Sequence, residues 1–226
     1  MQAAALLHLL QLSSPSLPVG AYSYSQGLEA ALESGLVHDQ TSARLWISHA
    51  LLQVVARFEA PLLWRLMQAF AQGDQAALEH WNECFIAARD TAELRAETIQ
   101  MGYSLAKLAQ SMQLGSGREM QMLAELAEVP FPTALAASAV ALDVPPNEAL
   151  LGFLFSWAEN QVLVCVKSVP LGQVAGQTLL LSLRPELEQA ALTTKSLQDE
   201  ELSNWSPGLS LLSMRHEVQY SRLYRS

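Results

Sequence analysis

Charged residues are scarce in this sequence of 226 residues. Only 15% of them are Asp, Glu, Lys or Arg, against roughly 25% in an ordinary soluble domain. Half of the residues are hydrophobic, which excludes a disordered chain. With so few charges, apolar patches are expected on the surface of a monomer, and such patches usually mark contact sites. The composition therefore predicts a folded protein that has partners.

Positive charge is rarer than negative charge. The chain has 13 Lys and Arg residues against 22 Asp and Glu residues, for a net charge of −9. Affinity for nucleic acid depends on clustered Lys and Arg that neutralise phosphates. The balance argues against a nucleic-acid partner.

Cysteine is nearly absent, and Cys84 and Cys165 are far apart in the sequence. This pattern does not indicate a disulfide framework and fits a cytoplasmic location. The longest apolar stretch, residues 149–169, is interrupted by polar side chains that include Glu159 and Lys167. Because a membrane span needs about 20 nearly uninterrupted apolar residues, we expect a buried helix and no membrane association.

Residues that favour strands are also few. The chain contains 41 Leu and 32 Ala but only 13 Val and three Ile, and Leu and Ala favour helix over sheet. We therefore predict the all-α class, with residues 1–226 forming a single globular helical bundle domain of about eight to ten helices.

Turn and capping residues divide the chain into helices. Asp39 or Thr41 is the expected N-cap of one helix, Asp74 begins another, and a third spans Thr91 to Gln113 before a turn at Gly115-Ser116-Gly117. Further expected boundaries are a kink or restart at Pro61, the prolines at 130, 132, 145 and 146, and the end of the long apolar helix at Pro170-Leu171-Gly172.

The last part of the chain has a different character. The pattern is less regular over 184–206, which we expect to be mobile. In the last 12 positions, Arg215, Arg222 and Arg225 lie among tyrosines, a reversal of charge within an acidic protein. Residues 207–226 are therefore interpreted either as a partner-binding tail, because charge complementarity guides encounter, or as a frayed terminus.

Sequence motifs of common enzyme classes are absent. There is no phosphate-binding Gly-x-x-x-x-Gly-Lys-Ser/Thr segment, no His-Glu-x-x-His, no Cys-x-x-Cys and no Gly-x-Ser-x-Gly. His80 and Cys84 could share a helix face, but two ligands do not make a metal site. We expect no enzyme activity, no cofactor and no metal site.

Two segments leave alternatives open. In Arg89–Glu97 the alternating charges are explained by ion pairs along a helix or by acid–base chemistry, and ion pairing is the default interpretation. Leu17–Glu29 collects Pro, Gly, Tyr, hydroxyl and acidic groups, which could build either a helix cap or a binding surface.

Four stretches, taken in order, resemble one known family. They are Leu10-Gln11-Leu12 with Leu17–Glu29 (LPVGAYSYSQGLE), Glu93-Leu94-Arg95, Val166–Gln173 (VKSVPLGQ) and Arg215–Ser226 (RHEVQYSRLYRS). They are similar to motifs of the urease accessory protein UreF family. Two positions depart from the family pattern: Asp90, just before the second stretch, replaces Glu, and Tyr224 replaces Phe. The resemblance extends from near residue 10 to the last residue.

This resemblance implies an all-helical, dimer-forming assembly factor for the nickel enzyme urease. Such a factor has no active site of its own. It binds the accessory protein UreD, also called UreH, and the GTPase UreG, and the complex delivers nickel to apo-urease. The C-terminal tail would become ordered when partners bind, with binding offsetting the ordering entropy.

The resemblance also implies roles for individual residues. The expected partner-binding residues are Glu29, Lys167, Arg215, His216, Glu217, Tyr220, Arg222 and Arg225, with Glu29 and Lys167 facing the GTPase; Lys167 could instead be a snorkelling side chain that closes an apolar helix. Pro18, Gly20 and Gly27 are expected to shape the backbone of the N-terminal motif. Together with Tyr22, Ser25 and Gln26 they are expected to form its structural motif.

Two alternative functions remain open at this stage. Arg222 or Arg225 could enter the GTPase site and accelerate GTP hydrolysis, as arginine fingers do. A weaker hypothesis is direct nickel carriage through His80 and Cys84 or through His216.

Overall fold

Helices are the regular elements of the protein. The computed structural model describes residues 2–114, 117–169 and 171–226, so Gly115, Ser116 and Pro170 lie outside the described residues. Within those ranges there are no strands, and the elements are α1 (Ala3–Leu12), η1 (Ala21–Ser23), α2 (Leu28–Glu33), α3 (Gln40–Gln53), η2 (Val55–Arg57), α4 (Glu59–Gln72), α5 (Gln75–Ala87), α6 (Ala92–Ser111), α7 (Arg118–Ala124), α8 (Phe131–Ala141), α9 (Pro146–Ser168), α10 (Gln173–Ser182), α11 (Arg184–Ser196), η3 (Asp199–Glu201) and α12 (Pro207–Glu217). The all-α class is confirmed, with more α-helices than expected because short ones such as α7 were not anticipated.

Side-chain caps fix several helix starts where the sequence predicted them. Asp39 caps α3, since its Oδ1 accepts a hydrogen bond of 2.7 Å from the N–H of Ser42. Asp74 and Thr91 cap α5 and α6 in the same way. These side chains satisfy N–H groups that have no partner within the helix.

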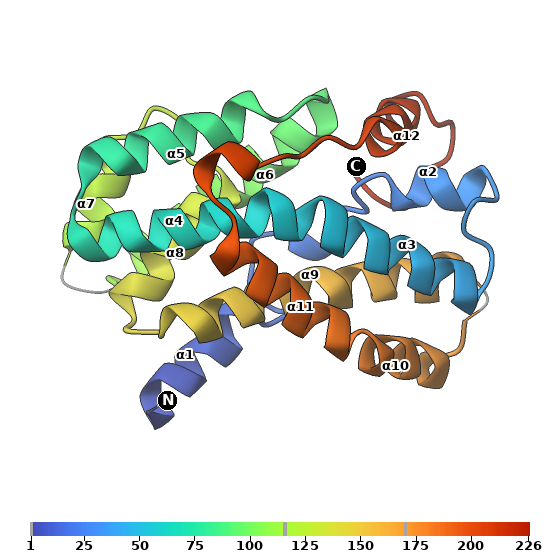
Figure 1. Ribbon diagram of the computed structural model, residues 1–226, viewed down its shortest axis with the longest axis horizontal. Coiled ribbons are helices and arrows are strands. Elements are labelled where there is room, and N and C mark those ends of the chain that lie inside the picture. Colours follow the sequence, from blue (N-terminus) through green and yellow to red (C-terminus); the bar gives the residue numbers. More distant parts are fainter. Residues whose placement is uncertain (1, 115–116, 170) are drawn as a thin grey trace.

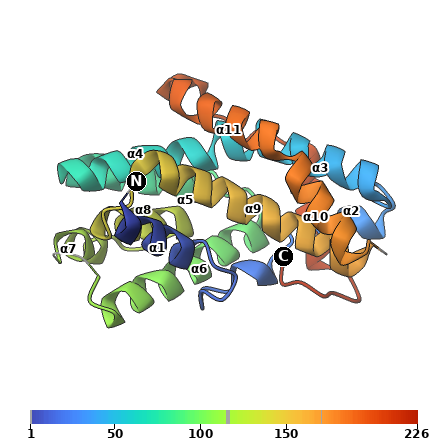
Figure 2. The same cartoon turned by 90° about the horizontal axis from the view of Figure 1, so that it is seen from below.

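The core is built around α8 and α9. Every residue from 132 to 139 of α8 is buried, and α8 packs against α4, α6 and α7. The long helix α9 packs against α3, α4, α10 and α11. Figure 1 shows α4 crossing α8, and Figure 2 shows α1 lying along the side of the molecule formed by α8 and α9.

One helix passes a length and composition test for crossing a membrane. It is α9, and 56% of its most apolar window is buried inside the protein. Its burial against neighbouring helices is the environment expected of a core helix.

The segment 184–206 is more regular than its sequence suggested. Residues Arg184–Ser196 form α11, with Pro185 in the first turn, where a missing N–H has no cost. Leu187, Ala190 and Thr194 are buried at helical spacing, and Arg65 of α4 pairs with Asp199 at 2.6 Å. The expected irregular pattern is wrong over α11, whereas mobility of this segment stays a prediction.

Gly102 allows α6 to approach the chain that leads into α8. A Cβ atom at this position would lie 2.0 Å from the carbonyl oxygen of Val129 and 2.6 Å from the carbonyl carbon of Pro130. Neither main-chain atom can move without displacing the start of α8.

We expect Gly102→Ala to lower the free energy of unfolding by about 3 kcal/mol, because overpacking against backbone cannot be relieved by a side-chain rotation. Urea denaturation followed by circular dichroism measures the change. Gly208→Ala is the matched control, since no heavy atom lies within 4 Å of a Cβ there and alanine favours the helix by about 0.5–1 kcal/mol. Equal stability of the two variants would contradict the prediction.

Candidate functional site

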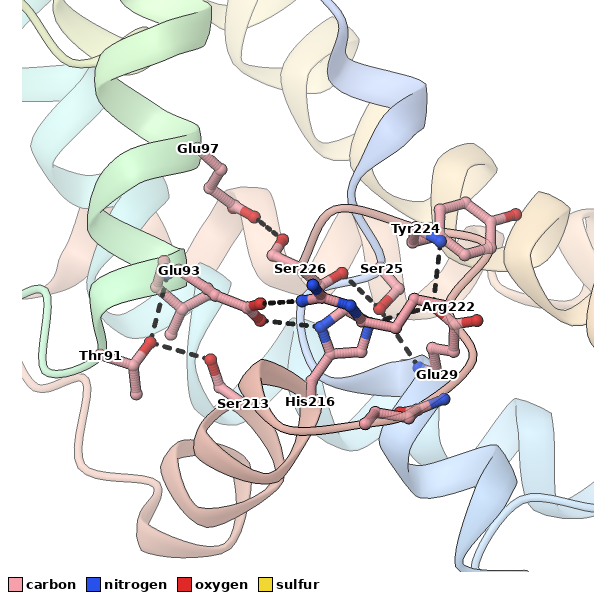
Figure 3. Close-up of polar contacts among 12 residues, drawn as sticks. Ser25, Glu29, Thr91, Glu93, Glu97, Ser213, His216, Arg222, Tyr224 and Ser226 are labelled. Atoms are coloured by element: carbon pink, nitrogen blue, oxygen red, sulfur yellow. Dashed lines mark hydrogen bonds and ion pairs between the residues drawn. The ribbon is translucent and has the colours of Figure 1, made fainter.

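The end of the chain folds back onto the N-terminal motif. Helix α12 packs against α2 and α6, and residues 218–226, here called the terminal segment, return across the same elements. Figure 3 shows side chains from α2, α6, α12 and the terminal segment directed toward one another. Three of the four stretches that carry the family resemblance therefore meet in one place.

His216 of α12 lies at the centre of this site. It is fully buried, and its two ring nitrogens face two carboxylates. Nδ1 lies 2.8 Å from Glu93 Oε2, and Nε2 lies 3.0 Å from Glu29 Oε2. The ring thus connects α6 with α2.

Glu29 is buried, and its carboxylate holds the main chain of the terminal segment. Its side chain accepts hydrogen bonds from the N–H groups of Leu223 at 2.7 Å and Tyr224 at 3.0 Å, in addition to His216. Only 6% of the residue is exposed. A buried carboxylate needs several donors of this kind, and the terminal segment supplies them.

Glu93 anchors the same segment from α6. Its Oε1 accepts a hydrogen bond of 2.9 Å from Arg222 Nη1, while Oε2 faces His216. The neighbouring cap Thr91 also contacts α12, through a hydrogen bond of 2.8 Å to Ser213 Oγ. The start of α6 is therefore a docking point for both α12 and the terminal segment.

Ser226 closes the arrangement against the N-terminal motif. Its main-chain oxygen accepts hydrogen bonds from the N–H groups of Ser25 at 2.6 Å and Gln26 at 3.2 Å, and from Ser25 Oγ at 2.5 Å. The N–H of Arg225 donates to the carbonyl of Ser23 at 2.8 Å. The last two residues are thus paired with residues 23–26.

Glu97 lies one helical turn beyond Glu93 and is almost fully buried. It accepts hydrogen bonds from Gln26 Nε2 at 2.7 Å and from Ser226 Oγ. Burial raises the pKa of Glu97 to about 7, and these hydrogen bonds offset the shift only in part. The ionised form is therefore destabilised in the folded protein.

Tyr224 lies over the end of α9. Lys167 Nζ lies 5.5 Å from the centroid of its ring, within the range of a cation–π contact. Burial, followed by the nearby Glu29 and Cys165, raises the pKa of Tyr224 to about 12. Lys167 itself is exposed, so its side chain covers the aromatic ring and keeps its ammonium group in water.

The residues expected to bind partners fall into two groups. Glu29 and His216 are buried. The others are exposed around the docked segment: Lys167, Arg215, Glu217, Tyr220, Arg222 and Arg225. The structure brings most of the expected residues together but separates those that hold the segment from those that face outward.

The N-terminal motif shapes the backbone, and its side chains also pair. Gln26 has a φ of 55° and Gly27 a φ of +81°, and a Cβ on Gly27 would lie 3.2 Å from Leu209 Cδ1 of α12. Tyr22 donates a hydrogen bond of 2.5 Å to Glu159 Oε2, and Trp157 Nε1 donates to Gln26 Oε1 at 2.7 Å.

The first residues of this motif lie at its outer edge. Pro18 and Gly20 are exposed, and Gly20 precedes η1 with a φ of +81°. The helix-cap interpretation of Leu17–Glu29 has support, since Ser25 Oγ accepts a hydrogen bond of 3.2 Å from the N–H of Glu29 in the first turn of α2, whereas a surface for a partner stays a prediction.

The expected ion pairs within Arg89–Glu97 are wrong. Arg89 pairs with Glu59 of α4 at 2.7 Å, and Arg95 pairs with Glu128 at 2.5 Å. Glu93 and Glu97, which share one face of α6, contact the terminal segment instead.

No group of three or more His, Cys, Asp or Glu side chains suited to a metal ion occurs among the described residues. Cys84 Sγ lies 3.8 Å from His80 Nε2, which leaves a pair of potential ligands. Both nitrogens of His216 face carboxylates. Neither arrangement supports the nickel-carriage hypothesis.

Several residues of the site were not expected from the sequence. Glu93 was noted only as part of a motif, and Glu97, Thr91 and Ser226 were given no role in partner binding. One signal was available, since acids four residues apart at the start of a helix share a face. The contacts of Thr91, Glu93 and Glu97 with α12 and Ser226, however, join residues more than 120 positions apart along the chain.

Comparison with known proteins gives a consistent result. The family model described as UreF matches residues 37–184. The chain is 73% identical over 226 residues to the urease accessory protein UreF of Janthinobacterium sp. (strain Marseille), with all of both chains covered. It is 59% identical to that of Nitrosospira multiformis, over 98% of each chain, and 49% identical to that of Azoarcus sp. (strain BH72), over 98% of this chain and 95% of the relative.

Because Glu97 is buried, we expect the folding stability of the protein to depend on pH. Because its pKa is higher in the folded protein than its ordinary value of 4.5, folding stability falls as pH rises from the ordinary pKa through about 7. Glu97→Gln removes the titration and can keep both hydrogen bonds. We expect it to raise the free energy of unfolding by roughly 3 kcal/mol more at about pH 8 than at about pH 5.

Urea denaturation of the wild type and the variant at both pH values measures this difference. Glu119→Gln is a control for the removal of another buried carboxylate. An equal effect of Glu97→Gln at both pH values would show that Glu97 does not titrate in this range.

Proposed function

The chain belongs to the UreF family of urease accessory proteins, and on this premise we propose that it is a non-catalytic scaffold that joins UreD/UreH and the GTPase UreG on apo-urease. Family membership implies a role in urease maturation. In the proposed mechanism, nickel is the cargo of the complex, and this chain holds the partners in the orientation that delivery requires.

The observation that carries the proposal is the surface around the terminal segment. Five side chains with flexible or aromatic polar ends are exposed there, from α9, α12 and the segment itself: Lys167, Arg215, Tyr220, Arg222 and Arg225. Tyrosine and arginine are the side chains most enriched at the energetic centres of interfaces. In an acidic protein this cationic surface is suited to an acidic partner face.

Glu29 and His216 contribute to this surface indirectly. Both are buried beneath the terminal segment, so a partner bound to the docked form cannot touch them. We assign them the role of holding the segment, through the N–H groups of Leu223 and Tyr224 and through Glu93.

A different surface, which is apolar, suits self-association. Leu6, Leu7 and Leu10 of α1 and Leu151 and Phe155 of α9 are each 42–66% exposed. The two helices pack together at Gly152, where a Cβ would lie 2.6 Å from Leu9 Cδ1. Exposed apolar groups on adjacent helices form the kind of patch that a homodimer buries, and we propose this face as the homodimer interface.

We place this function in the cytoplasm. Cys84 and Cys165 are both free thiols, the state that a reducing compartment maintains.

The scaffold proposal predicts that exposed residues at the terminal segment control partner capture. We expect the double variant Tyr220→Ala/Arg225→Ala to reduce capture of UreD/UreH or UreG in co-purification by at least about tenfold, because each truncation removes an interface anchor. The matched control is Tyr103→Ala/Arg184→Ala, which removes the same two side-chain types from exposed positions on α6 and α11. Equal capture by the two double variants would refute the assignment of the surface.

One observation favours a second candidate function, regulation of GTP hydrolysis by UreG. Arg222 is held by Glu93, but the guanidinium of Arg225 is exposed and has no hydrogen bond or ion pair among the described residues. An unengaged arginine beside a partner surface is suited to enter a nucleotide site and stabilise the transition-state charge.

This candidate predicts that Arg225→Ala lowers the rate of GTP hydrolysis in the complex by about 1,000-fold or more, as loss of an arginine finger does. Single-turnover hydrolysis by UreG, measured with saturating scaffold, is the assay. Arg215→Ala, at another exposed arginine of the same surface, is the control. An unchanged rate with Arg225→Ala would refute the arginine-finger role, and the scaffold function would then be the remaining proposal.

A further inference from the structure

The hydrogen bonds of His216 require an extra proton. A neutral imidazole offers one N–H donor and one lone pair, yet both of its nitrogens lie within 3.0 Å of carboxylate oxygens. One of these contacts can be a hydrogen bond from the neutral ring. The other needs one more proton, on the ring or on a carboxylate.

The surrounding donors place this proton on the ring. Glu29 accepts two main-chain N–H groups, and Glu93 accepts Arg222. Donors of this kind stabilise the ionised form of a carboxylate. Two hydrogen bonds donated by the ring, one to each carboxylate, therefore require both ring nitrogens to carry a proton.

We propose that His216 is a proton-dependent latch, which keeps the terminal segment docked while both ring nitrogens are protonated and releases it when one proton is lost. After loss of that proton, a ring lone pair would face a carboxylate at hydrogen-bond distance, and the ring is fully buried. Such a contact is repulsive, and a buried carboxylate that loses its donor is costly. Release of the segment exposes the groups to water.

Other charged groups around His216 have partners of their own or are exposed to solvent. On the elements that pack against α12, Asp90 accepts a hydrogen bond from Ser210, and Glu97 accepts hydrogen bonds from Gln26 and Ser226. Further charges are Lys167, which lies over Tyr224, the exposed Arg215 and Glu217 on α12 itself, and the exposed Arg225 of the terminal segment. Of these, Glu97 also titrates near neutral pH, so the test must separate it from His216.

The direction of the pH dependence follows from the bridge, by which we mean His216 between Glu29 and Glu93. In this proposal the docked state binds one proton more than the released state, so docking is favoured at low pH and weakens as pH rises. If the terminal segment carries the partner surface proposed above, partner capture would weaken in the same direction. This consequence rests on the proposed function, whereas the latch does not.

Amide hydrogen exchange of the complete chain tests the latch without any partner. The reporters are the N–H groups of Leu223 and Tyr224, which donate to Glu29. Between about pH 6 and about pH 9 we expect their protection factors, corrected for intrinsic exchange, to fall about tenfold per pH unit once the bridge loses its proton. Protection that stays constant across this range would overturn the proposal.

Glu93→Gln is the decisive variant. Its amide can donate to the Nδ1 lone pair of a neutral His216 and still accept from Arg222, so the bridge no longer needs the extra proton. We expect protection in this variant to be independent of pH. Glu97→Gln is the control and should keep the wild-type fall. A fall that persists in Glu93→Gln, or one that disappears in Glu97→Gln, would assign the proton elsewhere and refute the latch.

The nitrogen-15 spectrum of His216 in the wild type provides a measurement that depends on no variant. Both ring nitrogens should carry protons while the segment is protected, and the conversion to a neutral ring should coincide with the loss of protection. A neutral ring at about pH 6 with Leu223 and Tyr224 still protected would contradict the proposal.

Discussion

The arrangement at the end of the chain depends on the pairing of a buried imidazole with two carboxylates, one buried (Glu29) and one half-buried (Glu93). His216, Glu29 and Glu93 come from three different helices, and each is largely removed from water. A buried ion that loses its partner costs several kcal/mol. Each of the three groups therefore requires the other two, and together they fix the positions of α2, α6 and α12 at this end of the molecule.

The N-terminal motif and the terminal segment complete one another. Gln26 has a left-handed backbone, a conformation that a non-glycine residue adopts only when its surroundings hold it there. Its side chain is fixed by Glu97 and Trp157, and its N–H by Ser226. The motif thus forms a receptor for the terminal segment, and its unusual backbone is explained by that contact.

Features that depend on neighbouring residues could be predicted from the sequence. Features that depend on contacts between distant residues could not. The caps at Asp39, Asp74 and Thr91 are local, because each side chain bonds to an N–H three residues ahead. Helix α11 was missed because the pattern over 184–206 is less regular, although Pro185 is compatible with a first turn. The motifs located the site, but the burial of Glu29 depends on a histidine 187 positions later, a distance that no periodicity rule spans.

The two faces of the terminal segment explain why its residues have different roles. From Leu223 to Ser226 exposed and buried positions alternate: Leu223 and Arg225 are exposed, whereas Tyr224 and Ser226 are buried. An extended chain directs successive side chains to opposite sides, so docking one face determines where the other face points. The surface proposed for partner recognition is arranged in this way only while the segment is docked. In that proposal Glu29, Glu93 and His216 act by holding the segment and do not touch the partner.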